Sequence, residues 1–162
     1  MLFYKNISDY YEKIFPLNTT TVKFLEEVFI DEKKVLDLAC GDGKYTDAVS
    51  NEERFVTGVD LDQGMLKEAK ERYGVNKNIE FLEGNMLELD KIFEKNELDG
   101  IFCIGNSLVH LTSKNLIEEL IKAAYPTLKN NGKFVVQIIN YDRILEGNIN
   151  FLPTIKINGI EF

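Results

Sequence analysis

Apolar and polar side chains along this chain alternate with two periods, one typical of strands and one typical of helices. Short apolar runs predict five strands, at residues 34–39, 55–60, 79–83, 98–104 and 133–139. Apolar side chains three or four positions apart predict helices at residues 19–30, 45–50 and 63–73, and in a segment that Ser113 caps. Because strands and helices take turns along the chain, we expect a parallel sheet covered by helices.

The last two strands carry further signals. Residues 98–104 are apolar on both faces, which is typical of a central parallel strand. Asn131 and Gly132 form a turn signal that places the start of the fifth strand at residue 133. Four side chains of the fifth strand are expected to be buried on one face or the other: Val135, Val136, Ile138 and Ile139.

The C-terminal tail has weaker signals. Residues 142–146 predict a helical turn before Gly147. Residues 154–157 and 160–162 either pair as a hairpin across an Asn-Gly turn, or residues 160–162 begin a further strand.

The composition is that of a globular domain with its own core. The chain has 162 residues, of which 44% are hydrophobic and 28% are charged, and this length is sufficient for one domain. It shows neither an apolar run of the roughly 18 residues of a membrane span nor the pattern of a signal peptide. Cys40 and Cys103 each follow an apolar strand pattern, which favours buried free thiols in a reducing compartment. We therefore expect a cytoplasmic protein.

The charge narrows the choice of partners. A formal net charge of -8 disfavours nucleic acid, because phosphate neutralisation requires clustered lysines and arginines. A small amine, or another neutral or cationic small molecule, suits this charge better. We expect a small-molecule substrate, no nucleic acid and no membrane.

The most specific signal is a glycine-containing loop between the first two strands. The first strand leads into Gly41 and Gly43, and the second strand ends in the carboxylate of Asp60. Glycines let the backbone approach a ligand, and a carboxylate at the end of the next strand accepts hydrogen bonds from both ribose hydroxyls. This layout predicts a site for a nucleoside-containing cofactor.

The residues near this loop also indicate which cofactor it binds. A dinucleotide fingerprint has a third glycine three residues after the second, but here that position is Thr46. Asp37 adds a carboxylate at the end of the first strand, which favours a cation and disfavours a pyrophosphate. S-adenosylmethionine carries a sulfonium, an ammonium and a ribose but no phosphate, so it fits better than NAD. A dinucleotide or nucleotide-sugar enzyme of doubly wound fold is the alternative.

Several segments resemble the successive motifs of the class I S-adenosylmethionine-dependent methyltransferases. They are Asp37-Leu-Ala-Cys-Gly-Asp-Gly43, Asp60, Gly84-Asn-Met86 and the strand at residues 98–104. Residues 104–111 and 139–143 are similar to the glycine and sarcosine N-methyltransferase branch. The resemblance covers residues 35–141 and implies an α/β, Rossmann-like doubly wound sheet of strand order 3-2-1-4-5. It also implies an enzyme that methylates a small molecule, with an amine as the favoured acceptor.

The resemblance implies a set of cofactor contacts. They are Asp37, Ala39, Cys40, Gly41, Gly43, Asp60, Leu61, Met65, Asn85, Met86, Ile104 and Tyr11. Leu61 and Met65 would flank the adenine, although Met65 also suits ordinary core packing. Asn85 stands where the family commonly has an Asp that accepts from the adenine amino group, and an amide can fill that role. Tyr11 lies in an N-terminal segment that covers the cofactor in this family, or else packs on the core as part of an amphipathic helix.

Three residues are candidates on the acceptor side: Asn106, His110 and Tyr141. They follow strands four and five, and ligands of such sheets lie outside the carboxyl ends of the strands. His110 either shapes the site or is an ordinary packed or surface residue. Arg143 pairs either with a substrate carboxylate or with a neighbouring acid. No metal is expected, because no His, Asp and Glu cluster has ligand spacing.

The resemblance breaks after strand five. The family core continues with an antiparallel pair, strands six and seven, whereas this sequence stops as the next strand would begin. The chain is either truncated, or these strands are absent or supplied by a partner. We expect a single domain over residues 1–162, with a lid and helix at 1–30, the core at 34–141 and an incomplete C-terminal part at 142–162.

The missing strands raise two further expectations. An uncovered edge of strand five predicts a homodimer through this edge, or low stability as a monomer. They also leave open a second function: a module that binds S-adenosylmethionine or S-adenosylhomocysteine without turnover.

Overall fold

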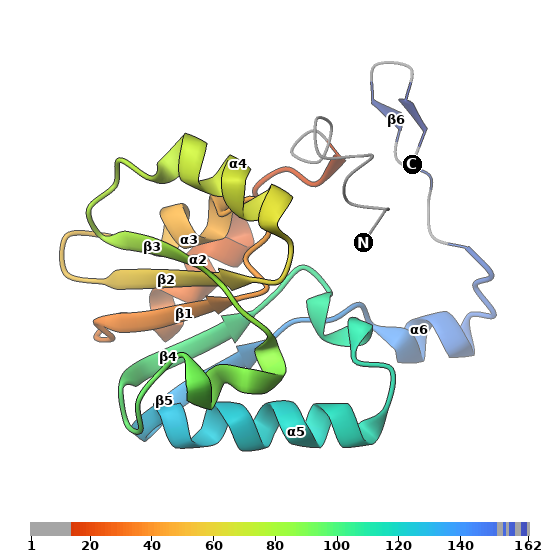
Figure 1. The fold of residues 1–162 in the computed structure, drawn as a ribbon. Helices are drawn as coiled ribbons and strands as arrows, with labels where there is room; N and C mark the ends of the chain where they lie inside the picture. The colour runs from red at the N-terminus through yellow and green to blue at the C-terminus, as the bar shows by residue number, and fades with distance from the viewer. Residues whose placement is uncertain (1–13, 152–153, 155, 158–159, 162) are drawn as a thin grey trace. The chain divides into compact units, whose positions relative to one another are not determined.

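Five parallel strands form the central sheet, in the order β3-β2-β1-β4-β5 (Figure 1). They are β1 (Lys34–Leu38), β2 (Phe55–Asp60), β3 (Ile79–Glu83), β4 (Leu98–Cys103) and β5 (Leu128–Val136). The computed structural model describes residues 14–151, 154, 156–157 and 160–161. The chain divides into two units, and this sheet lies in the larger one, Asn18–Ile138. The predicted fold class and strand order are confirmed.

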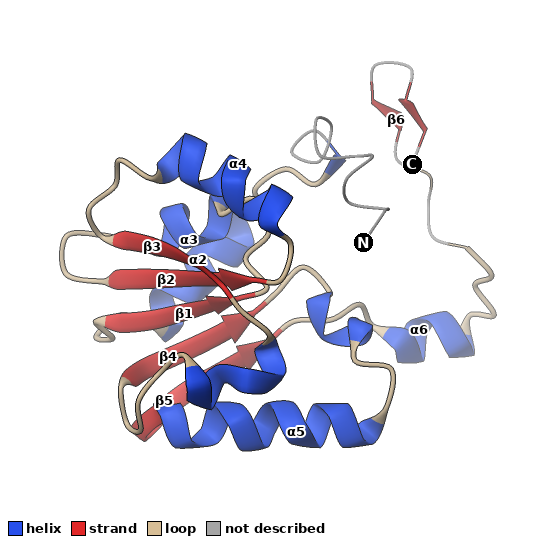
Figure 2. Cartoon of the chain, viewed as in Figure 1, coloured by secondary structure: helices blue, strands red, loops and turns tan. Residues whose placement is uncertain are grey.

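Helices cover both faces of the sheet (Figure 2). The larger unit contains α2 (Thr19–Val28), α3 (Lys44–Val49), α4 (Gln63–Tyr73) and α5 (Lys114–Ala124), and the 3-10 helices η1 (Met86–Lys91), η2 (Ser107–His110) and η3 (Tyr125–Thr127). Side chains of α2, α3 and α4 form one buried cluster with Val35 of β1. Side chains of η1 and α5 form a second cluster with Leu36 of the same strand. Neighbouring β1 residues thus face opposite layers, which the period of a strand requires.

Local sequence signals set the ends of the helices. The side chains of Asn18, Asp62 and Ser113 accept hydrogen bonds from backbone amides in the first turns of α2, α4 and α5. Gly74 ends α4 as predicted. Each cap satisfies amide groups that have no partner within the helix, so these boundaries follow from residues adjacent in sequence.

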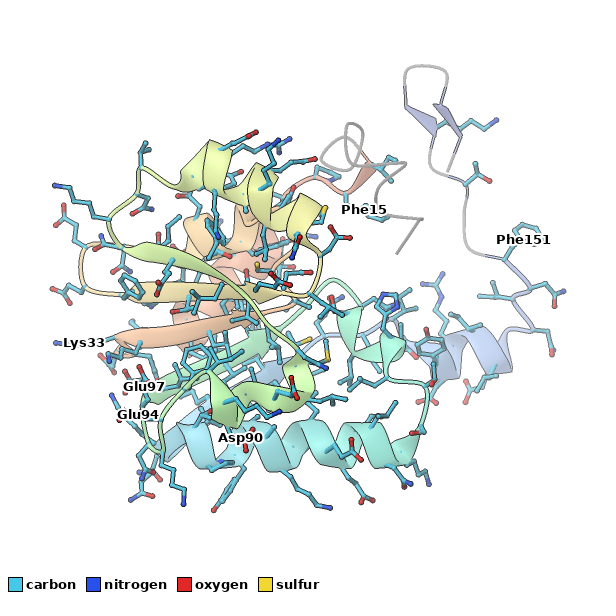
Figure 3. The ribbon with its side chains drawn as sticks, viewed as in Figure 1. Phe15, Lys33, Asp90, Glu94, Glu97 and Phe151 are labelled. Atoms are coloured by element: carbon cyan, nitrogen blue, oxygen red, sulfur yellow. The ribbon has the colours of Figure 1, made fainter. Side chains whose placement is uncertain are left out.

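The amino end of the sheet is held by charged side chains. The carboxylate of Asp99 accepts from the backbone amides of Lys33 and Lys34 and from the ammonium of Lys129, the last at 2.7 Å. Figure 3 shows Lys33 and Glu97 at this end of the sheet, where Lys34 and Glu97 form an ion pair of 3.5 Å. Because all five strands are parallel, their carboxyl ends lie together at the opposite edge of the sheet.

The prediction for the fifth strand was partly wrong. The strand begins at Leu128 rather than at residue 133, because Leu128 already pairs with Leu98 before a register shift. Asn131 has a φ of +67°, so the turn signal is real but lies within the strand. Val136 and Ile138 are 41% and 45% exposed instead of buried. Among the described residues, β5 is the last strand of its sheet and pairs with β4 alone, so its end is less covered than a central strand.

The smaller unit consists of residues 1–17 and 139–162. It contains the predicted helical turn as α6 (Tyr141–Glu146), which Gly147 ends. Its strands β6 (Lys156–Ile157) and β7 (Ile160–Glu161) pair antiparallel, which confirms the hairpin. Tyr11 and Phe162 lie outside the described residues. In the described part of the chain, no helix is long and apolar enough for a membrane span.

Candidate functional site

The loop after β1 has an unusual backbone at the carboxyl edge of the sheet. Ala39, Gly41 and Gly43 all have left-handed φ angles, of +61°, +56° and +77°. The amides of Ala39 and Cys40 donate to the carbonyl of Val59 at 2.8 and 3.1 Å, which anchors the loop to β2. A left-handed alanine costs about 1 kcal/mol or more, and such strain is concentrated at ligand sites.

Gly43 has a second reason to lack a side chain. A Cβ at this position would lie 2.6 Å from the ring of Phe81 and 2.9 Å from the Cβ of Ala69. Gly43 also forms the N-cap of α3 in its left-handed conformation. The absence of a side chain at Gly43 is therefore required by packing as well as by the backbone angle.

Asp60 at the end of β2 faces this loop. Its Oδ2 accepts from the amide of Gly41 at 2.8 Å, and its Oδ1 accepts from the amide of Asp62 at 2.9 Å. A carboxylate offers about four lone-pair directions, so each oxygen keeps acceptor capacity for a ligand. The two amides fix the orientation of the carboxylate, and this is the preorganisation that a contact to a ribose diol requires.

Asp37 lies beneath the loop and is 2% exposed. Its Oδ2 accepts from the hydroxyl of Thr46 at 2.7 Å. The pKa of Asp37 is raised to about 7. Burial is the largest cause, the charges of Asp60 and Asp42 also raise the pKa, and the hydrogen bonds from Thr46 lower it. Thr46, which replaces the third glycine of a dinucleotide site, therefore supports a buried carboxyl.

The remaining predicted cofactor residues lie either in the loop after β1 or in the segments that follow β2 and β3. Cys40 is buried, and burial followed by the charge of Asp37 raises the pKa of its thiol. Met65 is buried next to the loop, since a Cβ on Gly41 would lie 3.3 Å from its Cε. Leu61 is exposed. Met86 packs against the second buried cluster.

Asn85 follows β3 and has a structural role of its own. Its Oδ1 accepts from the amide of Leu87 at 3.0 Å and so caps η1. The cap fixes the side chain at the carboxyl edge, and its NH₂ group is not part of this bond. The residue can therefore serve both as a helix cap and as a ligand contact.

The segment after β4 forms the next part of the edge. Ile104 is buried, Asn106 has a left-handed φ of +69°, and His110 is exposed at the end of η2. The amide of Gly105 donates to the Oε1 of Gln137 at 2.8 Å, and the amide of Gln137 donates to the carbonyl of Cys103. The sheet thus brings the ends of β4 and β5 together, as predicted.

Two predicted acceptor residues belong to the other unit. Tyr141 begins α6 and is exposed, and Arg143 lies in the same helix. The amide of Arg143 donates to the side chain of Asn140. Their roles at the site stay predictions.

Comparison with known proteins identifies the family. The profile of the family described as "Methyltransferase domain" matches residues 35–132, the stretch that holds the loop and the sheet. The chain belongs to the class I S-adenosylmethionine-dependent methyltransferases.

The chain is also similar to individual relatives and to solved structures. It is 37% identical to glycine N-methyltransferase of Rattus norvegicus over 123 residues, which covers 69% of this chain and 42% of the relative. It is 28% identical over 124 residues to YqeM of Bacillus subtilis (strain 168), which covers 76% of this chain and 49% of the relative. An S-adenosylmethionine-dependent methyltransferase from Clostridium acetobutylicum ATCC 824 has the same fold, with a TM-score of 0.76 at 21% identity over 96% of this chain and 65% of that chain. The chain thus spans less than half the length of the two curated relatives.

The residues at the loop suit the cofactor of this methyltransferase family. Asp37, Asp42 and Asp60 are all carboxylates, and the glycines leave room for backbone contacts. Such a set favours the ammonium, sulfonium and hydroxyl groups of S-adenosylmethionine over a phosphate. In the described residues, no group of three or more His, Cys, Asp or Glu side chains is arranged to hold a metal ion.

Sequence reasoning missed one buried charge cluster of the methyltransferase. Asp42 is 2% exposed, and its Oδ2 lies 3.5 Å from the ammonium of Lys44 and 3.9 Å from the guanidinium of Arg72. The cluster ties the loop between the glycines to α3 and α4. Asp42 stands between two glycines, and a charged residue there resembles exposed turn chemistry, so only Arg72, 30 positions away, reveals its role.

Proposed function

We propose that this chain binds S-adenosylmethionine and supplies the cofactor-binding part of an enzyme that methylates a small molecule, with an amine as the favoured acceptor. One observation carries the proposal: a left-handed loop at the carboxyl edge of the sheet, with the oriented carboxylate of Asp60 on one side and the buried carboxyl of Asp37 beneath it. The glycine N-methyltransferase relative supports the choice of an amine.

Each residue of the loop has a part in this proposal. Asp60 accepts from the ribose hydroxyls with its remaining lone pairs. Asp37 and the carbonyls of Ala39 and Gly41 accept from the ammonium of the methionine portion. The adenine lies between Leu61 and Met65, with Asn85 and Met86 at its edge. Cys40 and Ile104 contribute backbone and apolar surface.

The acceptor side depends on the end of β4. The cofactor supplies an activated methyl group, and a neutral amine attacks it with its lone pair without help from a base. Asn106 orients the acceptor and His110 shapes the entrance. Catalysis then consists of holding donor and acceptor in line and excluding water.

A second candidate is a module that binds the cofactor without turnover. The observation in its favour is that the chain spans less than half the length of the curated relatives. Fold alone does not fix the chemistry of a site. Methylation of small amines by the purified chain separates the two candidates.

Calorimetric titration with S-adenosylhomocysteine tests the proposal. We expect micromolar binding by the parent and a dissociation constant at least about 30-fold higher for Asp60→Ala, because two charge-assisted hydrogen bonds are lost. The control is Asp31→Ala, an exposed acid before β1 at the amino end of the sheet, which should bind like the parent. Circular dichroism checks that each variant is folded. A folded parent that does not bind would contradict the proposal.

A further inference from the structure

A buried carboxyl, with no cationic partner among the described residues, lies beneath the cofactor loop. Asp37 is in the central strand, in register with Gly58 of β2 and Phe102 of β4. Its hydrogen bonds come from Thr46. The ion pairs within the described part of the chain do not include Asp37. A charged carboxylate in such surroundings has little to offset its lost hydration.

The titratable side chains described around Asp37 are acids and thiols, so none of them supplies a positive charge. Asp42 of the loop and Asp60 of β2 both raise the pKa of Asp37. Cys40 of the loop and Cys103 of β4 are buried thiols with raised pKa values, for Cys103 about 12. They therefore stay neutral near pH 7.

Two basic side chains beside the loop form ion pairs with other acids. Lys44 of α3 and Arg72 of α4 both pair with Asp42, and Arg72 also pairs with Glu68. Burial is the largest cause that raises the pKa of Asp37, to about 7, and the Thr46 bonds only oppose it. In the ligand-free protein, a substantial fraction of Asp37 is therefore neutral at pH 7.

We propose that Asp37 couples the cofactor site to pH: its carboxyl holds a proton in the ligand-free protein and releases it to solvent when a ligand ammonium binds at the loop. The inference rests on the proposed function. A cation next to a buried carboxyl stabilises its charged form, and by linkage the same coupling makes ligand affinity depend on pH. The neutral carboxyl lets the free loop fold without an unpaired buried charge, and the charged carboxylate forms when its counter-ion arrives.

Proton release during binding tests this coupling directly. S-adenosylhomocysteine is titrated calorimetrically into the parent and into Asp37→Asn in buffers of different ionisation enthalpy, and the slope gives the protons exchanged. At pH 7 we expect the parent to release up to about half a proton per site more than Asp37→Asn, and at pH 8.5 about none. Between pH 6 and pH 8 the dissociation constant of the parent should fall about tenfold, and that of Asp37→Asn less than about twofold.

Thr46→Val gives a second, directional test. It removes the hydroxyl that favours charged Asp37 and keeps the shape of the side chain, so the pKa of Asp37 should rise further. At pH 8 this variant should release more protons on binding than the parent does. Asp31→Asn, an exposed acid at the amino end of the sheet, is the matched control and should match the parent.

The outcomes separate the two proposals. Binding with equal proton release by the parent, Asp37→Asn and Thr46→Val would overturn the coupling and leave the proposed function intact. No binding by the folded parent at any pH would overturn the proposed function and the coupling with it. If Asp37→Asn fails to bind or fold, the larger release by Thr46→Val at pH 8 still supports the coupling, and its absence overturns it.

Discussion

At the scale of single residues, the site contains groups whose conformation or burial costs free energy in the folded protein. Ala39 has a left-handed backbone, and Asp37 is a carboxyl buried beside Asp42 and Asp60. Neither feature improves the stability of the ligand-free protein. Such exceptions to ordinary preferences are typical of functional sites.

Replacing Asp37 should therefore stabilise the protein in a pH-dependent way. The pKa of Asp37 is about 7 in the folded state against 3.8 as the ordinary value. Between these values the folded state binds the extra proton, so the contribution of Asp37 to stability is present at low pH and is lost as the pH rises through 7. Asparagine does not titrate, so we expect the unfolding free energy of Asp37→Asn relative to the parent to be on the order of 2 kcal/mol higher at pH 8 than at pH 5.

Urea unfolding at both pH values measures this difference. The Asp31→Asn control should differ from the parent by the same amount at pH 5 and at pH 8. A pH-independent difference for Asp37→Asn would show that its carboxyl has an ordinary pKa.

At the scale of elements, one buried guanidinium joins the ends of two helices to a strand. Arg54, next to β2, is 4% exposed and donates to the carbonyls of Phe29, Glu32 and Val49. Two of these carbonyls lie where α2 and α3 end. Helix ends have carbonyls without intrahelical partners, so Arg54 acts as a shared C-cap.

Removal of the Arg54 guanidinium should destabilise the fold without changing the contacts of the loop after β1. We expect Arg54→Leu to lower the free energy of unfolding by about 3 kcal/mol, because three buried carbonyls lose their donor. Arg54→Lys should recover part of the loss, since an ammonium reaches fewer of the three. Thermal and urea denaturation give the values, with Arg143→Leu on the exposed face of α6 expected within about 0.5 kcal/mol of the parent. An effect of Arg54→Leu as small as that of Arg143→Leu would refute the shared cap.

The elements also differ in how well they could be predicted. α4 matches its predicted bounds, because Asp62 and Gly74 are local signals. β5 does not, because its start depends on pairing with Leu98 and its burial depends on what covers the sheet edge. The sequence pattern within β5 itself predicts neither where the strand starts nor which of its side chains are buried.

At the scale of the whole molecule, β5 leaves one edge of the sheet unpaired within the described residues. Val136 and Ile138 add exposed apolar surface at its end. An unpaired edge with apolar side chains is a template for another strand, and a second copy of the chain is the partner that a purified sample supplies.

We therefore expect self-association through this edge. Light scattering over a dilution series should give a mass that rises above the monomer value with concentration. Val136→Lys should keep the chain monomeric, because a charged side chain blocks edge pairing, whereas Val75→Lys, at an exposed position after α4, should behave like the parent. A constant monomer mass for the parent would contradict the expectation.

Periodicity, caps and spacing among neighbouring residues predicted the elements, apart from the start of β5, and the loop with Gly41, Gly43 and Asp60. The strand order came from the family resemblance. Which groups are buried, and which groups they contact, depends on tertiary contacts. Asp37 accepts a hydrogen bond from Thr46, and Asp42 forms an ion pair with Arg72. Arg54 donates a hydrogen bond to the carbonyl of Phe29. The burial and the charge state of these side chains depend on residues that are distant in sequence and come into contact only in the folded protein. The periodicity of the sequence therefore does not predict them.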